Sequence, residues 1–116
     1  MITESEFIAA TDRTLAVIGA ALDAALAASA LDLDWSLNDG ILEIECDDGS
    51  KLIVNRHVPN REIWVAARSG GFHFRPSASL WRDTRSGDEL GAALAALLRD
   101  QAGLPLVLPA LVAPNL

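Results

Sequence analysis

The segment NRHVPNREIW, residues 55–64, gathers side chains that are suited to binding another molecule. Two arginines, two asparagines, a histidine and a glutamate accompany Trp64 within ten residues. The pattern indicates the end of one β-strand, a turn at the Pro-Asn pair, and the start of a second strand. Strand alternation places Trp64 opposite Ile63 and Val65, whose β-branched side chains suit a covered face. Trp64 is therefore expected on the solvent side, as an interface anchor. The alternative is a curled sheet in which Trp64 caps the core.

Four carboxylates are candidates for metal binding. Asp32 and Asp34 lie on one face of a predicted strand, roughly 7 Å apart by strand rise. Asp12 and Asp23 are close to three helical turns apart and share one side of a predicted helix. Because that helix leads into that strand, all four are expected to border one edge. Carboxylate oxygens suit divalent or ferric cations, but scattered exposed ones bind weakly. Surface acids that only keep the helix solvated are the alternative.

The sequence contains no motif for a zinc site, a nucleophilic catalytic site or a phosphate-binding loop. There is no CxxC, no HExxH and no histidine pair at helical spacing, so a tight zinc site is not expected. No Ser/His/Asp or Cys/His arrangement and no glycine-rich phosphate loop before a helix is present. His57 and His73 are candidate ligands, although a lone strand histidine is more often a polar surface group. The chain is not expected to be an enzyme.

Composition indicates a globular protein with a segregated charge. The chain has 116 residues, 51% of them hydrophobic and 22% charged, which is not typical of a disordered chain. The net charge is −7, yet residues 1–50 hold eleven acids and one base, whereas residues 51–85 hold seven bases and two acids. The acidic half suits cations or basic proteins and opposes nucleic-acid backbones. No nucleic-acid partner is expected.

The same sequence predicts a cytoplasmic protein without a membrane partner. The longest apolar run, near residues 16–30, is interrupted by Asp23 and is rich in alanine, so it is too weak for a membrane span. The N-terminus lacks the basic-then-apolar pattern of a signal peptide. One cysteine, Cys46, cannot form an internal disulfide, which favours a reducing compartment.

The predicted elements are a helix, a run of strands and a second helix. A capping box at residues 3–6 starts a helix that extends to about residue 28, and a second box at residues 86–89 starts a helix that ends at Gly103. Alternating segments predict strands at residues 31–38, 41–46, 51–56, 62–67 and 72–75, with a short one around Trp81. Two amphipathic helices need a common apolar surface. We therefore expect an α+β fold, a two-layer α/β sandwich with both helices on one face of a five- to six-stranded antiparallel sheet.

The tail, LPLVLPALVAPNL, is apolar and interrupted by prolines. Proline excludes a regular helix, and an apolar tail is not expected to stay in water. Residues 1–116 are therefore expected to form one domain, with the tail at residues 104–116 packed on the helices.

The runs GSKLIVNRHVPNREIWVAARSGGFHF and WRDTRSGDEL closely resemble the bacterial frataxins, the CyaY family. SEFIAATDRTL near the N-terminus is similar to the first helix of that family, and the resemblance covers residues 3–103. It implies a frataxin-like fold and a protein that binds iron weakly, as Fe²⁺ or Fe³⁺ and not as a tightly held prosthetic group. It also implies a regulator of iron–sulfur cluster assembly that contacts a cysteine desulfurase and a scaffold protein.

The resemblance assigns roles to the residues already singled out. It implies that Asn55 and Trp64 dock partners, with Arg56, His57 and Glu62 flanking them. It implies that the acidic ridge for iron includes four aspartates of this chain, namely Asp12, Asp23, Asp32 and Asp34. The ridge is thinner than in relatives, because alanines at positions 20 and 24 stand where acids are common.

An iron-storage or ferroxidase-type protein that acts through oligomers is the alternative function. It requires a clustered carboxylate–histidine centre or ordered assembly, and the sequence shows neither. A monomer is expected, with metal-dependent oligomers as the alternative.

Overall fold

Helix α1 (Glu4–Ala27) begins at the capping box that the sequence predicts. The Thr3 hydroxyl oxygen accepts the Glu6 N–H at 3.1 Å, and the Glu6 carboxylate accepts the Thr3 N–H at 3.2 Å. Ile2 and Phe7 are both buried beside this cap, as a hydrophobic staple requires. This structure, a computed structural model, describes residues 2–115.

Six antiparallel strands form one sheet in sequence order, with each strand paired to the next. The strands are β1 (Asp34–Asn38), β2 (Ile41–Glu45), β3 (Lys51–His57), β4 (Glu62–Ala67), β5 (Gly70–Ser77) and β6 (Leu80–Asp83). The prediction of a strand from residue 31 is wrong by three residues. Asp34 pairs with Glu45, the last residue of β2, so residues 31–33 have no strand to pair with.

Helix α2 (Leu90–Ala102) starts later than the second predicted capping box implies, so that prediction is wrong. Glu89 is the N-cap, and its carboxylate accepts the N–H groups of Gly91 at 2.7 Å and Ala92 at 3.1 Å. Ser86 instead belongs to the preceding turn, where its hydroxyl oxygen accepts the Asp88 N–H. The predicted end is confirmed, since Gly103 closes the helix in the left-handed conformation with φ of 67°.

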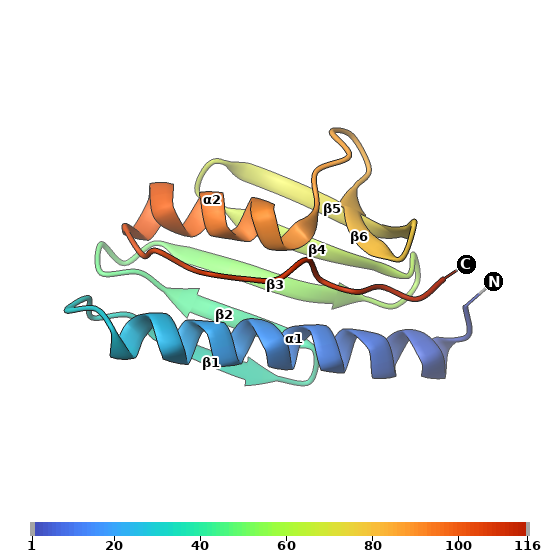
Figure 1. Cartoon of the computed structure of the whole chain (residues 1–116), viewed down its shortest axis with the longest axis horizontal. Coiled ribbons are helices and arrows are strands. Elements are labelled where there is room, and N and C mark those ends of the chain that lie inside the picture. The colour runs from blue at the N-terminus through green and yellow to red at the C-terminus, as the bar shows by residue number, and fades with distance from the viewer. Residues whose placement is uncertain (1, 116) are drawn as a thin grey trace.

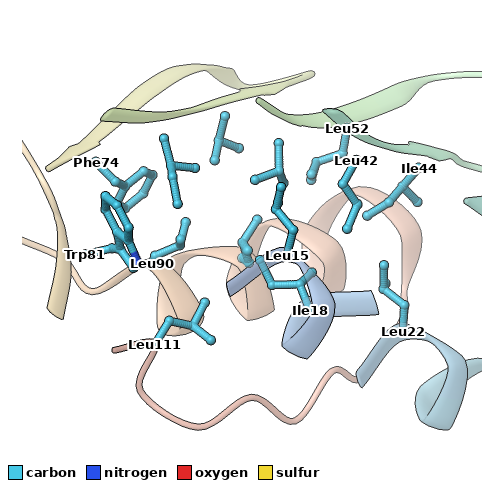
Figure 2. Close-up of a cluster of buried hydrophobic side chains, with 14 of the residues drawn as sticks. Leu15, Ile18, Leu22, Leu42, Ile44, Leu52, Phe74, Trp81, Leu90 and Leu111 are labelled. Atoms are coloured by element: carbon cyan, nitrogen blue, oxygen red, sulfur yellow. The ribbon is translucent and has the colours of Figure 1, made fainter. Parts of the chain in front are cut away.

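The two helices cover one face of the sheet, as predicted, and leave the other face open (Figure 1). The core lies between the layers, where α1 side chains meet the inward residues of β2 and β3 (Figure 2). Phe7 and Trp81 pack edge to face with ring centroids 6.1 Å apart at the other end of the core. The apolar side of each layer is therefore buried against the opposite layer.

The segment after α2 runs along the helical layer between the two helices (Figure 1). Leu104, Leu106, Leu111 and Ala113 are buried. The tail also pairs with the sheet edge, because Leu80 of β6 bridges Val112. Among residues 2–115, no helix is both long and apolar enough to cross a membrane.

Candidate functional site

Trp64 lies at the centre of the open sheet face. Its neighbours in the strand, Ile63 and Val65, are buried in the core, so Trp64 points the other way, as its strand phase predicts. Asn55 of β3 lies directly opposite Trp64, and His73 of β5 lies opposite it on the other side. The alternative in which Trp64 caps the core is therefore wrong.

Two imidazoles sandwich the indole of Trp64. The His57 ring stacks on one side with centroids 3.6 Å apart and planes 9° apart. The His73 ring stacks on the other side at 4.3 Å and 8°. Both faces of the indole are thus covered by flat polar rings.

Glu62 is the buried charge beneath this stack. It is only 3% exposed although it lies on the open face of the sheet. One carboxylate oxygen accepts the Trp64 indole N–H at 2.8 Å, and the other accepts Arg75 Nη2 at 2.6 Å and Nε at 3.1 Å. His73 Nδ1 lies 3.8 Å from the carboxylate. Glu62 therefore fixes the indole orientation while Arg75 neutralises its charge.

These contacts determine the pKa of Glu62. Burial by itself raises this pKa, but the hydrogen bond from Trp64 and the hydrogen bond and charge of Arg75 outweigh burial. The nearby His73 acts in the same direction as Arg75, so the pKa lies below the ordinary glutamate value. The site thus holds an ionised carboxylate at neutral pH.

The turn between β3 and β4 supports the stack from one end. His57 Nδ1 accepts the Asn60 N–H at 3.4 Å, so the imidazole is oriented by the turn itself. Arg61 takes a left-handed conformation with φ of 53°, and its guanidinium donates to the Val58 carbonyl oxygen. The predicted turn at Pro59 and Asn60 is confirmed.

Arg56 lies apart from the other four predicted docking residues. Alternation directs it to the helix-covered side of the sheet, where its side chain is 10% exposed. There it donates to Asp12 of α1 at 2.7 Å and to Asp39 of the β1–β2 turn at 3.3 Å. The structure brings together Asn55, His57, Glu62 and Trp64, and it assigns Arg56 to a link between layers.

The four predicted metal-binding aspartates are not gathered into one cluster. Asp12 is engaged by Arg56, and Asp23 accepts the indole N–H of Trp35 at 2.9 Å. Asp32 and Asp34 are exposed near the β1 edge. Within residues 2–115, no group of three or more His, Cys, Asp or Glu side chains is placed to hold a metal ion.

The open face carries opposite charges at its two ends. At the β1–β2 end, Asp34 pairs across the strands with Glu45, and Glu43 lies on the same face. At the β5–β6 end, Arg75 pairs with Arg82. Arg75 was not among the predicted site residues. The only sequence signal for it was that it shares strand phase with His73, two residues earlier.

The fold and this face together define a small two-layer α/β sandwich protein with polar and aromatic side chains gathered on the uncovered side of its sheet. Residues 1–104 match the family model of the frataxin-like domain, and the chain belongs to that family. The resemblance found in the sequence is therefore confirmed.

Individual relatives cover nearly the whole chain. The iron–sulfur cluster assembly protein CyaY of Dechloromonas aromatica is 53% identical over 106 residues, which span 90% of this chain and 97% of the relative. The frataxin from Psychromonas ingrahamii superimposes with a TM-score of 0.81 at 30% identity, over 90% of this chain and 96% of that one. Trimeric yeast frataxin from Saccharomyces cerevisiae, solved as a ferrous complex, has a TM-score of 0.71 over 81% of this chain and 86% of that one. At 23% identity that last likeness concerns the fold alone.

Proposed function

We propose that this protein is a non-enzymatic regulator and adaptor of iron–sulfur cluster assembly in the cytoplasm. Its open sheet face docks on the cysteine desulfurase and the scaffold protein, and its acidic ridge carries weakly bound iron. The names of its close relatives, iron–sulfur cluster assembly proteins, support the assembly role. The iron is cargo that exchanges with the surroundings, so no tightly bound group is required.

The observation that carries the docking proposal is the preorganised Trp64. Binding normally costs about 0.5–1.5 kcal/mol for each side chain that is immobilised at an interface. The His57 and His73 stacking and the Glu62 hydrogen bond already hold the Trp64 side chain in one orientation. Tryptophan is one of the residue types that are enriched among interface hot spots, which cluster near the centre of an interface.

The docking proposal is tested by Trp64→Ala and Trp64→Phe. We expect Trp64→Ala to weaken binding to the purified desulfurase or scaffold protein by at least about tenfold, the range of a hot-spot loss. Trp64→Phe keeps the stacked ring but loses the hydrogen bond to Glu62, so its loss is expected to be smaller. Binding is measured by isothermal titration calorimetry, with a thermal melt of each variant to show that the fold persists.

Val107→Ala is the matched control, since Val107 is 88% exposed on the helical layer, away from the open face. It is expected to bind both partners as the parent chain does. Unchanged affinity of Trp64→Ala for both partners would refute docking through the open face.

The iron proposal is supported by the exposed acids at the β1 edge. Asp32 and Asp34 have no ion pair in the described part of the chain, whereas Asp12 and Asp23 are engaged by Arg56 and Trp35. Hard oxygen ligands suit Fe²⁺ and Fe³⁺, and without a closed cluster the affinity is low. We assign the first contact with iron to Asp32 and Asp34, with Asp12 and Asp23 as further ridge ligands.

Anaerobic calorimetric titration with ferrous iron tests this assignment. We expect Asp32→Asn combined with Asp34→Asn to reduce the binding heat, while Asp100→Asn on α2 leaves it unchanged. Equal heats from the double variant and the parent chain would remove the ridge from the proposal. Oxygen consumption on adding ferrous iron is expected to stay at the uncatalysed rate, and a marked acceleration would favour the ferroxidase alternative.

A further inference from the structure

A hollow lies on the helical side of the sheet, between β5 and α2. It has a volume of about 350 Å³ and an apolar wall formed by Phe72, Ala93, Ala96 and Leu97. Around its mouth lie Asp83, the last residue of β6, and Arg85 and Asp88 from the loop that joins β6 to α2. That loop rises beside the sheet before the chain turns into α2 (Figure 1). The hollow is large enough for one apolar side chain.

The hollow opens because β6 covers only part of β5. The β5–β6 pairing extends from Ser77 to Phe74 and is continued by one hydrogen bond, from the Thr84 N–H to the His73 carbonyl oxygen at 2.9 Å. The first part of β5 has no further strand beside it in the described structure. Such an uncovered strand edge is a template for an extended segment of another chain.

The hollow is continuous with the Trp64 surface. A shallow groove of about 240 Å³ on the open face is lined by Asn55, Trp64 and Ala66, and it shares Gly71, Phe72 and His73 with the hollow. Gly71 leaves the surface between the groove and the hollow open, because it has no side chain. A Cβ placed there would meet only one atom, the Val65 carbonyl oxygen at 4.0 Å. His73 therefore belongs to both features, because its ring stacks on Trp64 and the same residue lines the hollow.

We propose that the partner which covers Trp64 also reaches around the β5 edge at Gly71 and inserts an apolar side chain into this hollow. The inserting residue is carried on an extended segment that lies along the uncovered part of β5. This inference rests on the proposed docking function and adds a second anchor point to it. Partner anchors that fill a desolvated pocket contribute more to affinity than the flat contacts around them.

The charges at the mouth specify the segment further. Among the residues that line the hollow, Asp83 and Asp88 carry carboxylates and Arg85 carries a guanidinium, so the charge of the lining is net negative. Asp83 is held in place by the N–H groups of Arg85 at 2.8 Å and Ser86 at 3.4 Å. We therefore assign to the segment a lysine or arginine next to its apolar residue. Neighbouring side chains on an extended segment point to opposite sides, so one enters the hollow while the other stays at its rim.

The test uses Ala96→Trp, which fills the hollow from the α2 wall, with Ala92→Trp as the matched control. Ala92 is an exposed residue one turn earlier on α2 and does not line the hollow. We expect Ala96→Trp to weaken binding of the desulfurase or the scaffold protein by about tenfold, or 1.4 kcal/mol. Ala92→Trp is expected to bind within about twofold of the parent chain, a difference of less than 0.5 kcal/mol.

Asp88→Lys provides a second variant that leaves the hollow open and changes only an exposed side chain. It is expected to weaken the same partner, with a loss that shrinks as salt is raised because the contact is electrostatic. Parent-like binding by both Ala96→Trp and Asp88→Lys, alongside a loss in Trp64→Ala, would overturn the second anchor and leave the proposed function standing. If the parent chain binds neither partner, the proposed function fails and the second anchor fails with it.

Discussion

Trp64 is held by three neighbours from three strands, and each of them limits a different motion. His57 and His73 cover its two faces, and Glu62 accepts its indole N–H. Glu62 is in turn held by Arg75, so the orientation of a surface tryptophan depends on an ion pair between a buried carboxylate and a largely exposed guanidinium. A buried charge is tolerated only when it is paired and hydrogen-bonded, and all of its partners here belong to the open face. The proposed docking surface is therefore preorganised at its centre before any partner binds.

Glu62→Gln tests this coupling through pH. Because the folded-state pKa of Glu62 lies below its ordinary value of 4.5, the ionised carboxylate stabilises the fold above that value. This contribution declines as pH falls from about 4.5 toward the lower folded-state pKa. We expect Glu62→Gln to be about 1.5–3 kcal/mol less stable at pH 7, the range of hydrogen bonds to a charged group, and to lose less stability on acidification. Urea unfolding at pH 7 and at steps below pH 4.5 measures both effects.

Other carboxylates also contribute to the dependence of the free energy of unfolding on pH, and one exposed glutamate provides the control. The pKa of Asp48 is lowered chiefly by the Ser50 side chain, and that of Glu6 chiefly by the Thr3 side chain, so part of the acid slope persists in Glu62→Gln. Glu45→Gln, at an exposed position of the same face, is expected to follow the parent chain. An acid slope in Glu62→Gln equal to that of the parent would contradict the coupling.

Among the helices and strands, the start of α2 shows how a preceding turn can override a local capping-box signal. The turn before the helix needs Gly87 at a φ of 79° and uses the Asp83 carboxylate to bind the N–H groups of Arg85 and Ser86. Ser86 is committed to that turn, and Glu89 caps the helix instead. The same Glu89 carboxylate accepts the N–H of Leu111 at 2.9 Å. One side chain therefore joins the β6–α2 loop, the helix and the tail.

Glu89→Ala is expected to destabilise the protein by about 1–2 kcal/mol, the cost of a lost N-cap, because three N–H groups lose their acceptor. Ser86→Ala is the matched control and is expected to cost less than about 0.5 kcal/mol, as is usual for a surface substitution. Glu89→Gln keeps an oxygen acceptor and is expected to lie between the two. Urea unfolding of the three variants measures the order, and a larger loss in Ser86→Ala than in Glu89→Ala would contradict it.

For the whole molecule, the tail closes the groove between the helices and covers one edge of the sheet. The Trp81 N–H donates to the Leu111 carbonyl oxygen at 3.4 Å, and the Ala113 N–H donates to the Ser79 carbonyl oxygen at 2.8 Å. The tail thus protects the β6 edge from pairing with another chain. The family match ends at residue 104, so this closure is contributed by residues beyond the matched part.

Truncation after Leu104 is expected to lower the melting temperature, and it tests the prediction that residues 1–116 form one domain. Leu106 and Leu111 would each lose about 1.5–3 kcal/mol of burial, part of which is offset by the entropy of the released chain. A net loss of about 1–3 kcal/mol corresponds to a shift of roughly 5–15 °C for a domain of this size. Differential scanning calorimetry measures the shift, with Val107→Ser as the control, and an unchanged melting curve would show that the tail adds no stability.

Local patterns in the sequence were sufficient for the number and order of the elements and for the direction of Trp64, although the starts of β1 and α2 were predicted wrongly. The Thr3 capping box, the strand phase of Trp64 and the Gly103 stop depend on neighbours within a few residues, so periodicity and turn chemistry predicted them. The four ridge aspartates and the five predicted docking residues were identified as two separate sets, because each set was found from local spacing or from a local motif. How those sets join could not be read from spacing, since it depends on contacts between residues far apart in the chain. Arg56 pairs with Asp12 across 44 residues, and Arg75 reaches Glu62 across 13. Only the packing of helix on sheet and strand beside strand decides such pairs, because a charged side chain can be buried only where the folded chain offers it a partner.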